Sequence, residues 1–302
     1  MKVLVTGGNG FIGGYVVEAL KERGHTPVLF DRYARGDTGE DEYFLGDITV
    51  DADCTEAMAH VDAFIHLAAV LGTQETIDNP RPAAHTNILG GLNVLNAAAQ
   101  YGIPGTYIGV GNHWMNNTYS ITKTTIERFV DMFNKYRGTK INIVRAMNAY
   151  GPRQVPASPY GPAKVRKITP SFCCRAILGH DIEIYGDGTQ VSDMVWVGDV
   201  ARALMLATEH AAEGDVYDPI EVGPVKNNTV NDVANLINHL SGNKSKIVHL
   251  PMRKGELENS VVVADVRGLY KIGMNPTKDL MPLYDGMEKT VNYFTEYLSA
   301  DS

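Results

Sequence analysis

The first half of the chain alternates between short, almost fully apolar runs and longer amphipathic segments. The run Val3-Leu4-Val5 predicts a buried parallel strand, and residues 15–24, closed by Gly24, predict a helix behind it. The same alternation predicts further strands at 27–31, 44–48, 61–69, 106–110 and 140–146, and helices at 54–60, 82–101 and 119–136. Apolar strands alternating with helices are typical of a parallel sheet covered on both faces. We therefore predict an α/β fold with a doubly wound parallel sheet.

The pattern loosens after Gly151 and Pro152. Residues 154–161 are rich in Pro, Ser and Gly, which predicts an irregular loop. Beyond it we expect helices at 169–178, 199–209, 229–240 (with Thr229 as its cap) and 283–298, and short strands at 182–185, 191–197, 216–217, 220–222 and 247–250. The prediction is one domain over residues 1–150 and a smaller α/β lobe over 151–302. Some C-terminal segments are expected to return to the first domain.

A glycine-rich turn, TGGNGFIG from Thr6 to Gly13, joins the first strand to the first helix. In a strand–turn–helix setting Gly7 permits the tight turn, Gly10 lets the backbone approach a pyrophosphate, and Gly13 lets the helix pack closely. The residues that open the helix, Phe11 and Ile12, add free N–H groups at its positive end. The alternative is a loop in which glycine only makes the turn. With both flanks matching, we predict a dinucleotide-binding Rossmann domain.

An acidic residue, Asp31, ends the second predicted strand about twenty residues past the glycines, where such folds place the carboxylate that binds the adenosine ribose. This favours NAD as the cofactor. NADP stays open, since Arg32 and Arg35 follow closely and suit a 2′-phosphate. The alternative for Asp31 is an acid that starts a turn.

Composition narrows the class of protein. Among 302 residues the formal net charge is −8, which argues against a general nucleic-acid-binding surface. No apolar run is long enough to span a bilayer, and residue 1 leads straight into a strand, so we expect neither a membrane segment nor a signal peptide. The three cysteines, Cys54, Cys173 and Cys174, have neither disulfide nor metal spacing, which fits a reducing cytoplasm and no bound metal.

Tyr119 and Lys123 stand four residues apart at the start of a predicted helix, so they share one helix face. A lysine ammonium near a phenol lowers the phenol pKa and makes tyrosinate accessible near neutrality. The lysine can also hold a ribose hydroxyl. His66, at the end of a buried strand, is expected to be a packed, hydrogen-bonded histidine instead of a catalytic one.

Together these motifs resemble the short-chain dehydrogenase/reductase superfamily, specifically its extended branch of nucleotide-sugar epimerases and dehydratases, over nearly the whole chain. Thr6–Gly13 resembles the family's cofactor loop, and the Tyr-x-x-x-Lys pair its acid/base pair. The other matching segments are Gly46-Asp47-Ile48, His66-Leu67-Ala68-Ala69, Asn87 with Gly90-Gly91, Arg145-Ala146-Met147-Asn148-Ala149-Tyr150-Gly151-Pro152, Ile184–Gln190 and Val197–Val200.

The resemblance implies a role for each matching residue. Tyr119 is implied as the acid/base at the sugar hydroxyl, with Lys123 as its electrostatic partner. Asn148 and Arg253 are implied as substrate residues near the diphosphate of a nucleotide sugar. The implied cofactor contacts are Gly7, Gly10, Phe11, Ile12, Gly13, Asp31, Arg32, Asp47, Ile48, Leu67, Ala68, Ala69, Asn87, Tyr119 and Lys123. The first domain would then bind NAD and the second lobe the nucleotide sugar.

The sequence departs from the family at several positions. No Ser or Thr stands at the end of the strand Tyr107-Ile108-Gly109-Val110, where the sequence has Gly109, Val110, Gly111 and Asn112. Ser192 replaces a second arginine expected to bind the diphosphate. Thr118, Asn112 and His113 are candidates for the missing donor, and Lys164, Arg166 and Lys167 for the missing phosphate contact. The Thr-Asp-Glu triplet of 4,6-dehydratases is absent, which argues against simple dehydration.

The predicted activity is NAD-dependent epimerisation of a nucleotide sugar, at C4, by transient hydride transfer to tightly bound NAD. Alternatives are a keto-sugar reductase, an atypical dehydratase, or a catalytically impaired or regulatory NAD-binding relative. We expect the loops 71–82 and 154–161 to line the sugar pocket. We also expect a homodimer formed through the helices around 87–101 and 119–136, because the first is apolar on more than one side.

Overall fold

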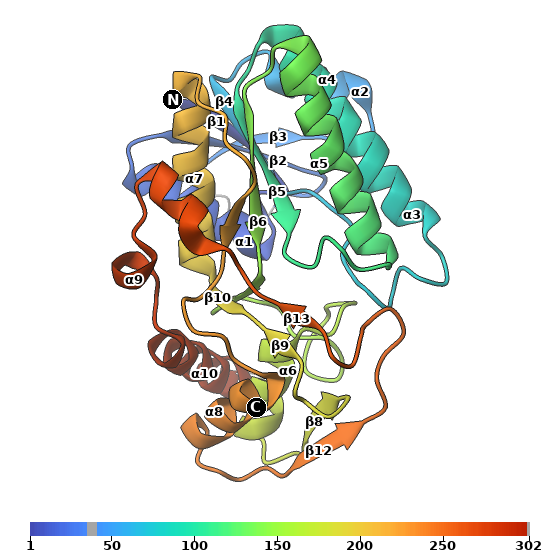
Figure 1. The fold of residues 1–302 in the computed structure, drawn as a ribbon, viewed down its shortest axis with the longest axis vertical. Coiled ribbons are helices and arrows are strands. Elements are labelled where there is room, and N and C mark those ends of the chain that lie inside the picture. The colour runs from blue at the N-terminus through green and yellow to red at the C-terminus, as the bar shows by residue number, and fades with distance from the viewer. Residues whose placement is uncertain (35–40, 301–302) are drawn as a thin grey trace.

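The computed structural model describes residues 1–34 and 41–300, and its larger part is built on one parallel sheet (Figure 1). Within these ranges seven strands pair in the order β11-β6-β5-β4-β1-β2-β3. Every pairing is parallel. The strands are β1 (Lys2–Thr6), β2 (Thr26–Asp31), β3 (Glu42–Leu45), β4 (Ala63–His66), β5 (Gly105–Val110), β6 (Ile141–Ala146) and β11 (Ile220–Val222).

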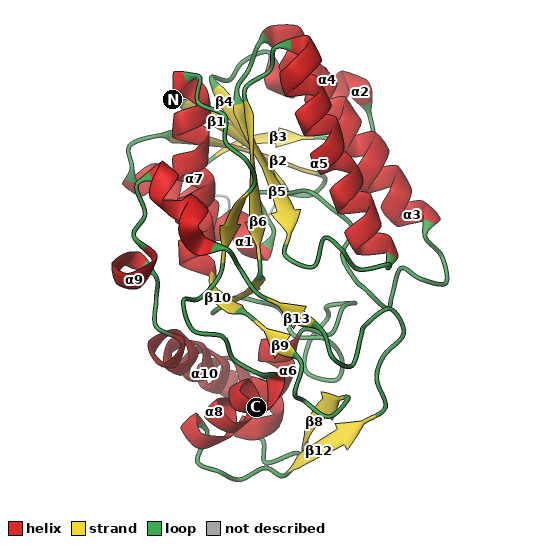
Figure 2. Ribbon diagram, in the orientation of Figure 1, coloured by secondary structure: helices red, strands yellow, loops and turns green. Residues whose placement is uncertain are grey.

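Helices cover both faces of this sheet, which confirms the predicted doubly wound fold (Figure 2). One face packs against α1 (Phe11–Glu22) and α7 (Val197–Glu213). The other packs against α2 (Asp51–Met58), α4 (Gly91–Tyr101) and α5 (Thr118–Arg137). The helix expected at 82–101 is a continuous run of a short α3 (Arg81–Ala83), a π-helical turn η1 (Ala84–Gly90) and α4.

The smaller lobe has its own apolar core below the sheet in Figure 1. Three helices, α6 (Ile168–Ile177), α8 (Val230–Leu240) and α10 (Leu283–Ala300), pack there. Thr229 caps α8 as predicted: its hydroxyl accepts a hydrogen bond from Asp232 N (3.1 Å). Short parallel pairs complete the lobe: β7 (Asn148–Tyr150) with β10 (Met194–Trp196), β8 (Ile182–Tyr185) with β12 (Ile247–Leu250), and β9 (Val191–Ser192) with β13 (Val261–Val262).

The two halves of the chain are interleaved. Although β11 and α7 follow residue 150 in the sequence, they belong to the main sheet and its covering layer. The turns η2 (Val266–Ile272) and α9 (Pro276–Asp279) then lead to α10. The predicted domain boundary after residue 150 therefore stays a prediction.

Three predicted strands differ from those of the structure, because their backbone groups hydrogen-bond to side chains or pair with different strands. Residues 216–217 form no strand, since Tyr217 N donates to the side chain of Asn142 (2.9 Å). The strand at 44–48 is displaced to Glu42–Leu45, and Asp47 N donates to the carboxylate of Asp53 (2.8 Å). Residues 191–197 divide into β9 and β10, which pair with different strands.

No helix in the described ranges is both long enough and apolar enough to cross a membrane.

The glycine turn after β1 has the geometry that the sequence predicts at two of its three positions. Gly7 has a φ of +72°, which few other residues adopt at low cost. A Cβ at Gly13 would lie 2.4 Å from Gly7 O and 2.7 Å from Gly8 O. Both neighbours are backbone atoms, so α1 can begin at this distance from the turn only without a side chain there.

Gly13→Ala is expected to lower the free energy of unfolding by about 1–3 kcal/mol, because the new methyl group must displace backbone atoms. Urea unfolding followed by circular dichroism measures this loss. Gly10→Ala is the matched comparison, since its Cβ would come only within 3.1 Å of Gly7 O. It should unfold more nearly like the parent yet bind the predicted dinucleotide more weakly. Equal stability of the parent and Gly13→Ala would contradict the packing argument.

Candidate functional site

A cavity of about 760 Å³ opens where the carboxyl ends of the main strands face the smaller lobe. In doubly wound folds, ligands bind at this edge of the sheet. The cavity is lined by all the residues that we predicted as catalytic, cofactor-binding or substrate-binding except Asn87. One end is formed by the glycine turn and the other by the smaller lobe.

The start of α1 presents backbone N–H groups to this cavity. Phe11, Ile12 and Gly13 line it, and no side chain caps the helix at Gly10. Because the first N–H groups of a helix lack intrahelical partners and carry partial positive charge, they suit a pyrophosphate. The absence of a side chain at Gly10 leaves the backbone open to close approach.

Two carboxylates stand beside this turn. Asp31, at the end of β2, accepts hydrogen bonds from Arg32 N (2.8 Å) and Asn9 N (3.2 Å). Asp47 accepts two hydrogen bonds from Thr49, and Arg32 Nη1 lies 3.9 Å from its other oxygen. Burial opposes ionisation of Asp47, but the hydrogen bonds from Thr49 outweigh it and the net effect lowers the pKa of this carboxyl. Arg35, the other arginine considered for a 2′-phosphate, lies outside the described residues.

His66 is a packed, hydrogen-bonded residue, which confirms the prediction. Thr6 Oγ1 accepts from Leu67 N (3.1 Å) and Ala68 N (3.2 Å) and lies 2.6 Å from Nδ1 of His66. With its oxygen already accepting two N–H groups, the Thr6 hydroxyl is assigned as donor to a neutral imidazole. Burial lowers the pKa of His66 to about 3, with a further contribution from the charge of Lys123.

Asn87 is buried beneath the cavity wall and holds together the segments above it. Its Oδ1 accepts from Val70 N (2.7 Å), and its Nδ2 donates to Val70 O (3.1 Å) and to Thr122 Oγ1 (2.9 Å). The residue therefore ties the loop after β4 to η1 and α5. Any effect of this side chain on a ligand passes through that loop.

Tyr119 and Lys123 both face the cavity from the first turns of α5. Asn117 fixes the start of this helix by accepting a hydrogen bond from Ser120 N (2.9 Å). Lys123 is 2% exposed, and its Nζ lies 4.1 Å from the centre of the Tyr107 ring. Burial lowers the pKa of Lys123 to about 7, against the opposing charge of Glu127. A charged and a neutral amine are therefore both accessible near neutral pH.

The pKa of Tyr119 departs from the direction expected from its lysine neighbour. Burial raises this pKa to about 12. The sequence pattern identified a cation four residues away, but it could not show that Lys123 would be buried and Tyr119 partly buried. Desolvation disfavours the charged form of each group, and it is the cause of the raised pKa of Tyr119.

The space beside Gly111, near which the resemblance places a hydroxyl, is filled by Met147. A Cβ at Gly111 would lie 2.1 Å from Met147 Sδ. Of the candidate donors, Thr118 Oγ1 donates to Thr76 O (2.9 Å), and His113 Nδ1 is buried with no partner among the described residues. Asn112 lines the cavity together with Tyr119. Sequence reasoning missed Met147, whose effect depends on β6 lying beside β5.

Positive side chains gather at the smaller lobe's end of the cavity. Arg166, Lys167 and Arg253 line both this cavity and a smaller adjoining one of about 40 Å³. The guanidinium carbons of Arg253 and Arg166 lie 4.9 and 5.3 Å from the centre of the Tyr185 ring. Lys164 also lines the main cavity. The tertiary structure thus gathers cations near the position where Ser192 replaces an arginine.

Ser192 itself has a different partner. Asn148 Nδ2 donates to Ser192 Oγ (2.6 Å), and both residues line the cavity. Arg253 pairs with Glu256, three residues later, and Arg166 Nη1 lies 2.9 Å from Glu183 Oε2. Each of these arginines is thus oriented by a carboxylate before any ligand binds.

The loops that were expected to form the sugar pocket contribute to the wall. Leu71, Gly72, Thr73 and Glu75 line it from the first loop, and Gln154 and Val155 from the second. The first loop also meets the segment that carries Arg253: Thr73 Oγ1 donates to Glu256 Oε1 (2.9 Å). This contact links the two sides of the cavity.

Comparison with known proteins places this geometry in a family. The chain is 28% identical to a UDP-glucose 4-epimerase of Mycolicibacterium smegmatis over 97% of this chain and 98% of the relative. It is 29% identical to a UDP-N-acetyl-alpha-D-glucosaminuronate decarboxylase of Bacillus cytotoxicus over 84% of each.

A solved structure, that of a Thermus thermophilus UDP-glucose 4-epimerase in complex with NAD, aligns with a TM-score of 0.82 at 27% identity. The alignment covers 97% of this chain and 99% of that one. A profile of the NAD dependent epimerase/dehydratase family matches residues 3–223. The chain belongs to the NAD dependent epimerase/dehydratase family.

Proposed function

We propose that this protein is a UDP-sugar epimerase that inverts C4 of the sugar with tightly bound NAD. The observation that carries the proposal is one cavity that joins a dinucleotide-binding turn to the Tyr119 and Lys123 pair. The names of its relatives support UDP as the nucleotide and epimerisation as the reaction.

The residues at the sheet end of the cavity fit NAD. The N–H groups opening α1 would hold the pyrophosphate, with Gly10 giving room for close approach. Asp31 would accept hydrogen bonds from the adenosine ribose, while Asp47 and Ile48 would border the adenine. A negative charge at Asp31 disfavours a 2′-phosphate, which supports NAD over NADP.

At the reacting carbon Tyr119 would take the proton of the C4 hydroxyl and return it when the opposite epimer forms. Bound NAD supplies the hydride acceptor and donor for the same carbon. A charged Lys123 would stabilise the tyrosinate, countering the burial that raises its pKa to about 12. The pocket must also let the keto sugar turn over between the two hydride transfers.

The smaller lobe would hold the nucleotide diphosphate. Arg253 is the matching family residue, and Arg166 and Lys167 would replace the arginine absent at Ser192. Guanidinium and ammonium donors form charge-assisted hydrogen bonds with phosphate oxygens. Binding would require Arg253 to exchange part of its contact with Glu256 for the phosphate.

Asn112 would supply the donor that the missing hydroxyl gives in the family. It lines the same cavity as Tyr119, and its Nδ2 donates to Met115 Sδ (3.5 Å), which leaves the second N–H of this group for a ligand. Met147 occupies the space at Gly111. A carboxamide N–H that donates to the sugar oxygen would stabilise the charge that develops there.

We further propose a cytoplasmic homodimer. Apolar side chains lie exposed on η1 and α5, among them Leu89 and Ile121, each 52% exposed. Pairing these helices with those of a second copy would remove that area from water. Three buried cysteines held as free thiols fit a reducing compartment.

The purified protein is expected to contain NAD and to convert one UDP sugar into its C4 epimer without net formation of reduced cofactor. Proton NMR of products from a panel of UDP sugars, with nicotinamide absorbance followed in parallel, measures both. Tyr119→Phe should lower kcat by about a hundredfold or more while retaining NAD.

Other outcomes identify the alternatives. Net consumption of reduced cofactor would indicate a reductase, and loss of water or carbon dioxide a dehydratase or decarboxylase. Bound NAD without turnover of any sugar would indicate an impaired or regulatory relative. Unchanged turnover by Tyr119→Phe would exclude the proposed acid/base role.

Asn112→Ala is expected to lower kcat by about a hundredfold with little change in KM, because the donated hydrogen bond is needed most in the transition state. The measurement is steady-state kinetics on the sugar found above. Thr118→Ala is the matched control, since its hydroxyl is already bonded to Thr76 O, and it should leave kcat near the parent value. Equal kcat for Asn112→Ala and the parent would rule out this donor.

Sedimentation equilibrium is expected to give about twice the chain mass of 33.0 kDa. Ile121→Glu should shift the population toward monomer, because a charge in a packed apolar interface must lose its water. Tyr270→Glu changes another exposed apolar residue (56% exposed) on η2 and should leave the dimer intact. A monomeric parent protein would overturn the proposed assembly.

A further inference from the structure

A buried carboxylate lies one helical turn beyond Lys123. Glu127 is 3% exposed on the same inner face of α5, and its Oε2 accepts two hydrogen bonds from Arg145, at 2.7 and 3.0 Å. Its other oxygen, Oε1, is buried and has no hydrogen-bond partner among the described residues. An ionised oxygen without a partner is costly in such a place, so its retention calls for a role.

Gly109 makes the room for this oxygen. A Cβ at position 109 of β5 would lie 2.3 Å from Glu127 Oε1 and 2.9 Å from Arg145 Cγ. Even the smallest side chain would push the carboxylate away. The backbone here is in an ordinary strand conformation, so the glycine is required by the carboxylate and not by the turn.

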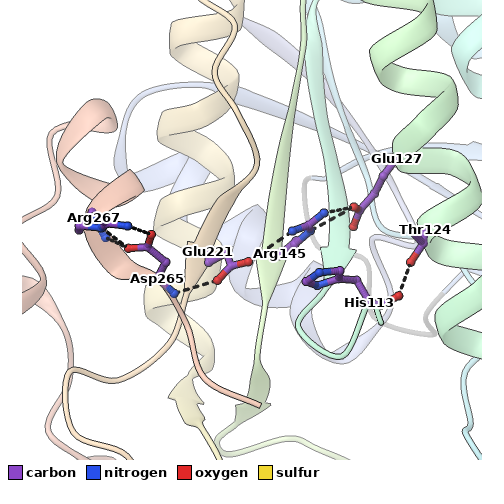
Figure 3. Close-up of polar contacts among 7 residues, drawn as sticks. All are labelled: His113, Thr124, Glu127, Arg145, Glu221, Asp265 and Arg267. Carbon is purple, nitrogen blue, oxygen red and sulfur yellow. Dashed lines mark hydrogen bonds and ion pairs between the residues drawn. The ribbon is translucent and has the colours of Figure 1, made fainter. Parts of the chain in front are cut away.

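Arg145 is shared between two carboxylates, which Figure 3 shows on either side of it. Its Nη1 lies 3.3 Å from Glu221 Oε1 on β11, and Glu221 Oε2 accepts from Asp265 N (2.8 Å). Arg145 is thus held from the far side without Glu127. An apolar pair of similar volume would fill the same space as Arg145 and Glu127. Buried ion pairs seldom make a protein more stable than such an apolar pair does, so packing alone does not explain why these charges are present.

The charged and titratable groups around Lys123 come from three elements. Tyr107 on β5 lies beneath the ammonium, and His66 on β4 lies beyond it with its ring 5.6 Å from that of Tyr107. Tyr119 and Glu127 lie on its own helix. His66 is neutral and both phenols are protonated over the pH range in which Lys123 titrates, so Glu127 is the anion that acts on the ammonium.

We propose that Glu127 is a positioning residue that keeps Lys123 charged beside Tyr119, in space provided by Gly109. An opposite charge favours the protonated amine, whereas burial opposes it. The carboxylate does not touch the substrate or the cofactor and acts through the lysine. Its significance for catalysis rests on the proposed function, but its effect on Lys123 does not.

The test is the titration of Lys123, followed by NMR of protein carrying ¹³C at the lysine ε-carbons and assigned by the loss of its signal in Lys123→Arg. Glu127→Gln has the same size and leaves Arg145 bound to Glu221, so it is expected to fold. Its Lys123 midpoint should lie lower than that of the parent by about 1 pH unit, because an anion one helical turn away has been removed.

Glu221→Gln is the matched control. It removes the other carboxylate from the same arginine and should leave the Lys123 midpoint within error of the parent. Gly109→Ala should lower the midpoint in the same direction as Glu127→Gln, by displacing the carboxylate. Equal midpoints in the parent and in Glu127→Gln, or an equal shift in Glu221→Gln, would overturn the inference.

Activity provides a separate readout. If the ammonium is the active form, the alkaline limb of the kcat profile should move to lower pH in Glu127→Gln and stay in place in Glu221→Gln. A shifted Lys123 titration without turnover of any sugar would leave the inference standing and overturn the proposed function. A kcat profile that stays in place in Glu127→Gln while the Lys123 titration moves would overturn the role of Glu127 as a positioning residue in turnover.

Discussion

The burial of one ammonium group, that of Lys123, constrains the groups packed around it. An amine removed from water loses its proton readily, yet the proposed chemistry needs it charged beside a phenol. Two neighbouring groups favour the charged form of this amine: the face of the Tyr107 ring and the carboxylate of Glu127. That carboxylate in turn needs Arg145 and a glycine at 109, so one charge links α5 to two neighbouring strands.

Close approach of backbone segments is the main constraint at the other end of the cavity. The turn after β1 must approach both the start of α1 and the loop after β4. Gly7 and Gly13 permit the two approaches by having no side chains. The Thr6 hydroxyl then holds that loop in place by accepting hydrogen bonds from two of its N–H groups, and it donates its own hydrogen bond to Nδ1 of His66. The cofactor end of the site is therefore built mainly from backbone atoms.

At two positions where the sequence departs from the family pattern, other residues nearby in the fold offer hydrogen-bond donors. Where a hydroxyl is missing, Met147 fills the space at Gly111 and Asn112 remains at the cavity wall. Where an arginine is missing, Ser192 accepts from Asn148, and Arg166 and Lys167 stand with Arg253 nearby. The protein thus presents hydrogen-bond donors at both ends of the proposed substrate, which favours an active enzyme over an impaired relative.

The order of residues was enough to predict the doubly wound sheet, the glycine turn and the placement of Tyr119 and Lys123 in one cavity. These follow from local rules: apolar periodicity, glycine spacing and the four-residue repeat of a helix face. The direction of the Tyr119 pKa lay beyond such rules, because desolvation depends on everything packed around a group. The contacts of Met147 with Gly111 and of Glu127 with Gly109 lay beyond them too, since they exist only once β5 pairs with β6 and α5 packs over both strands. Position along the chain thus predicts which residues carry the chemistry. Folding decides their charge and their neighbours, because burial and contact between distant segments arise only when the chain folds.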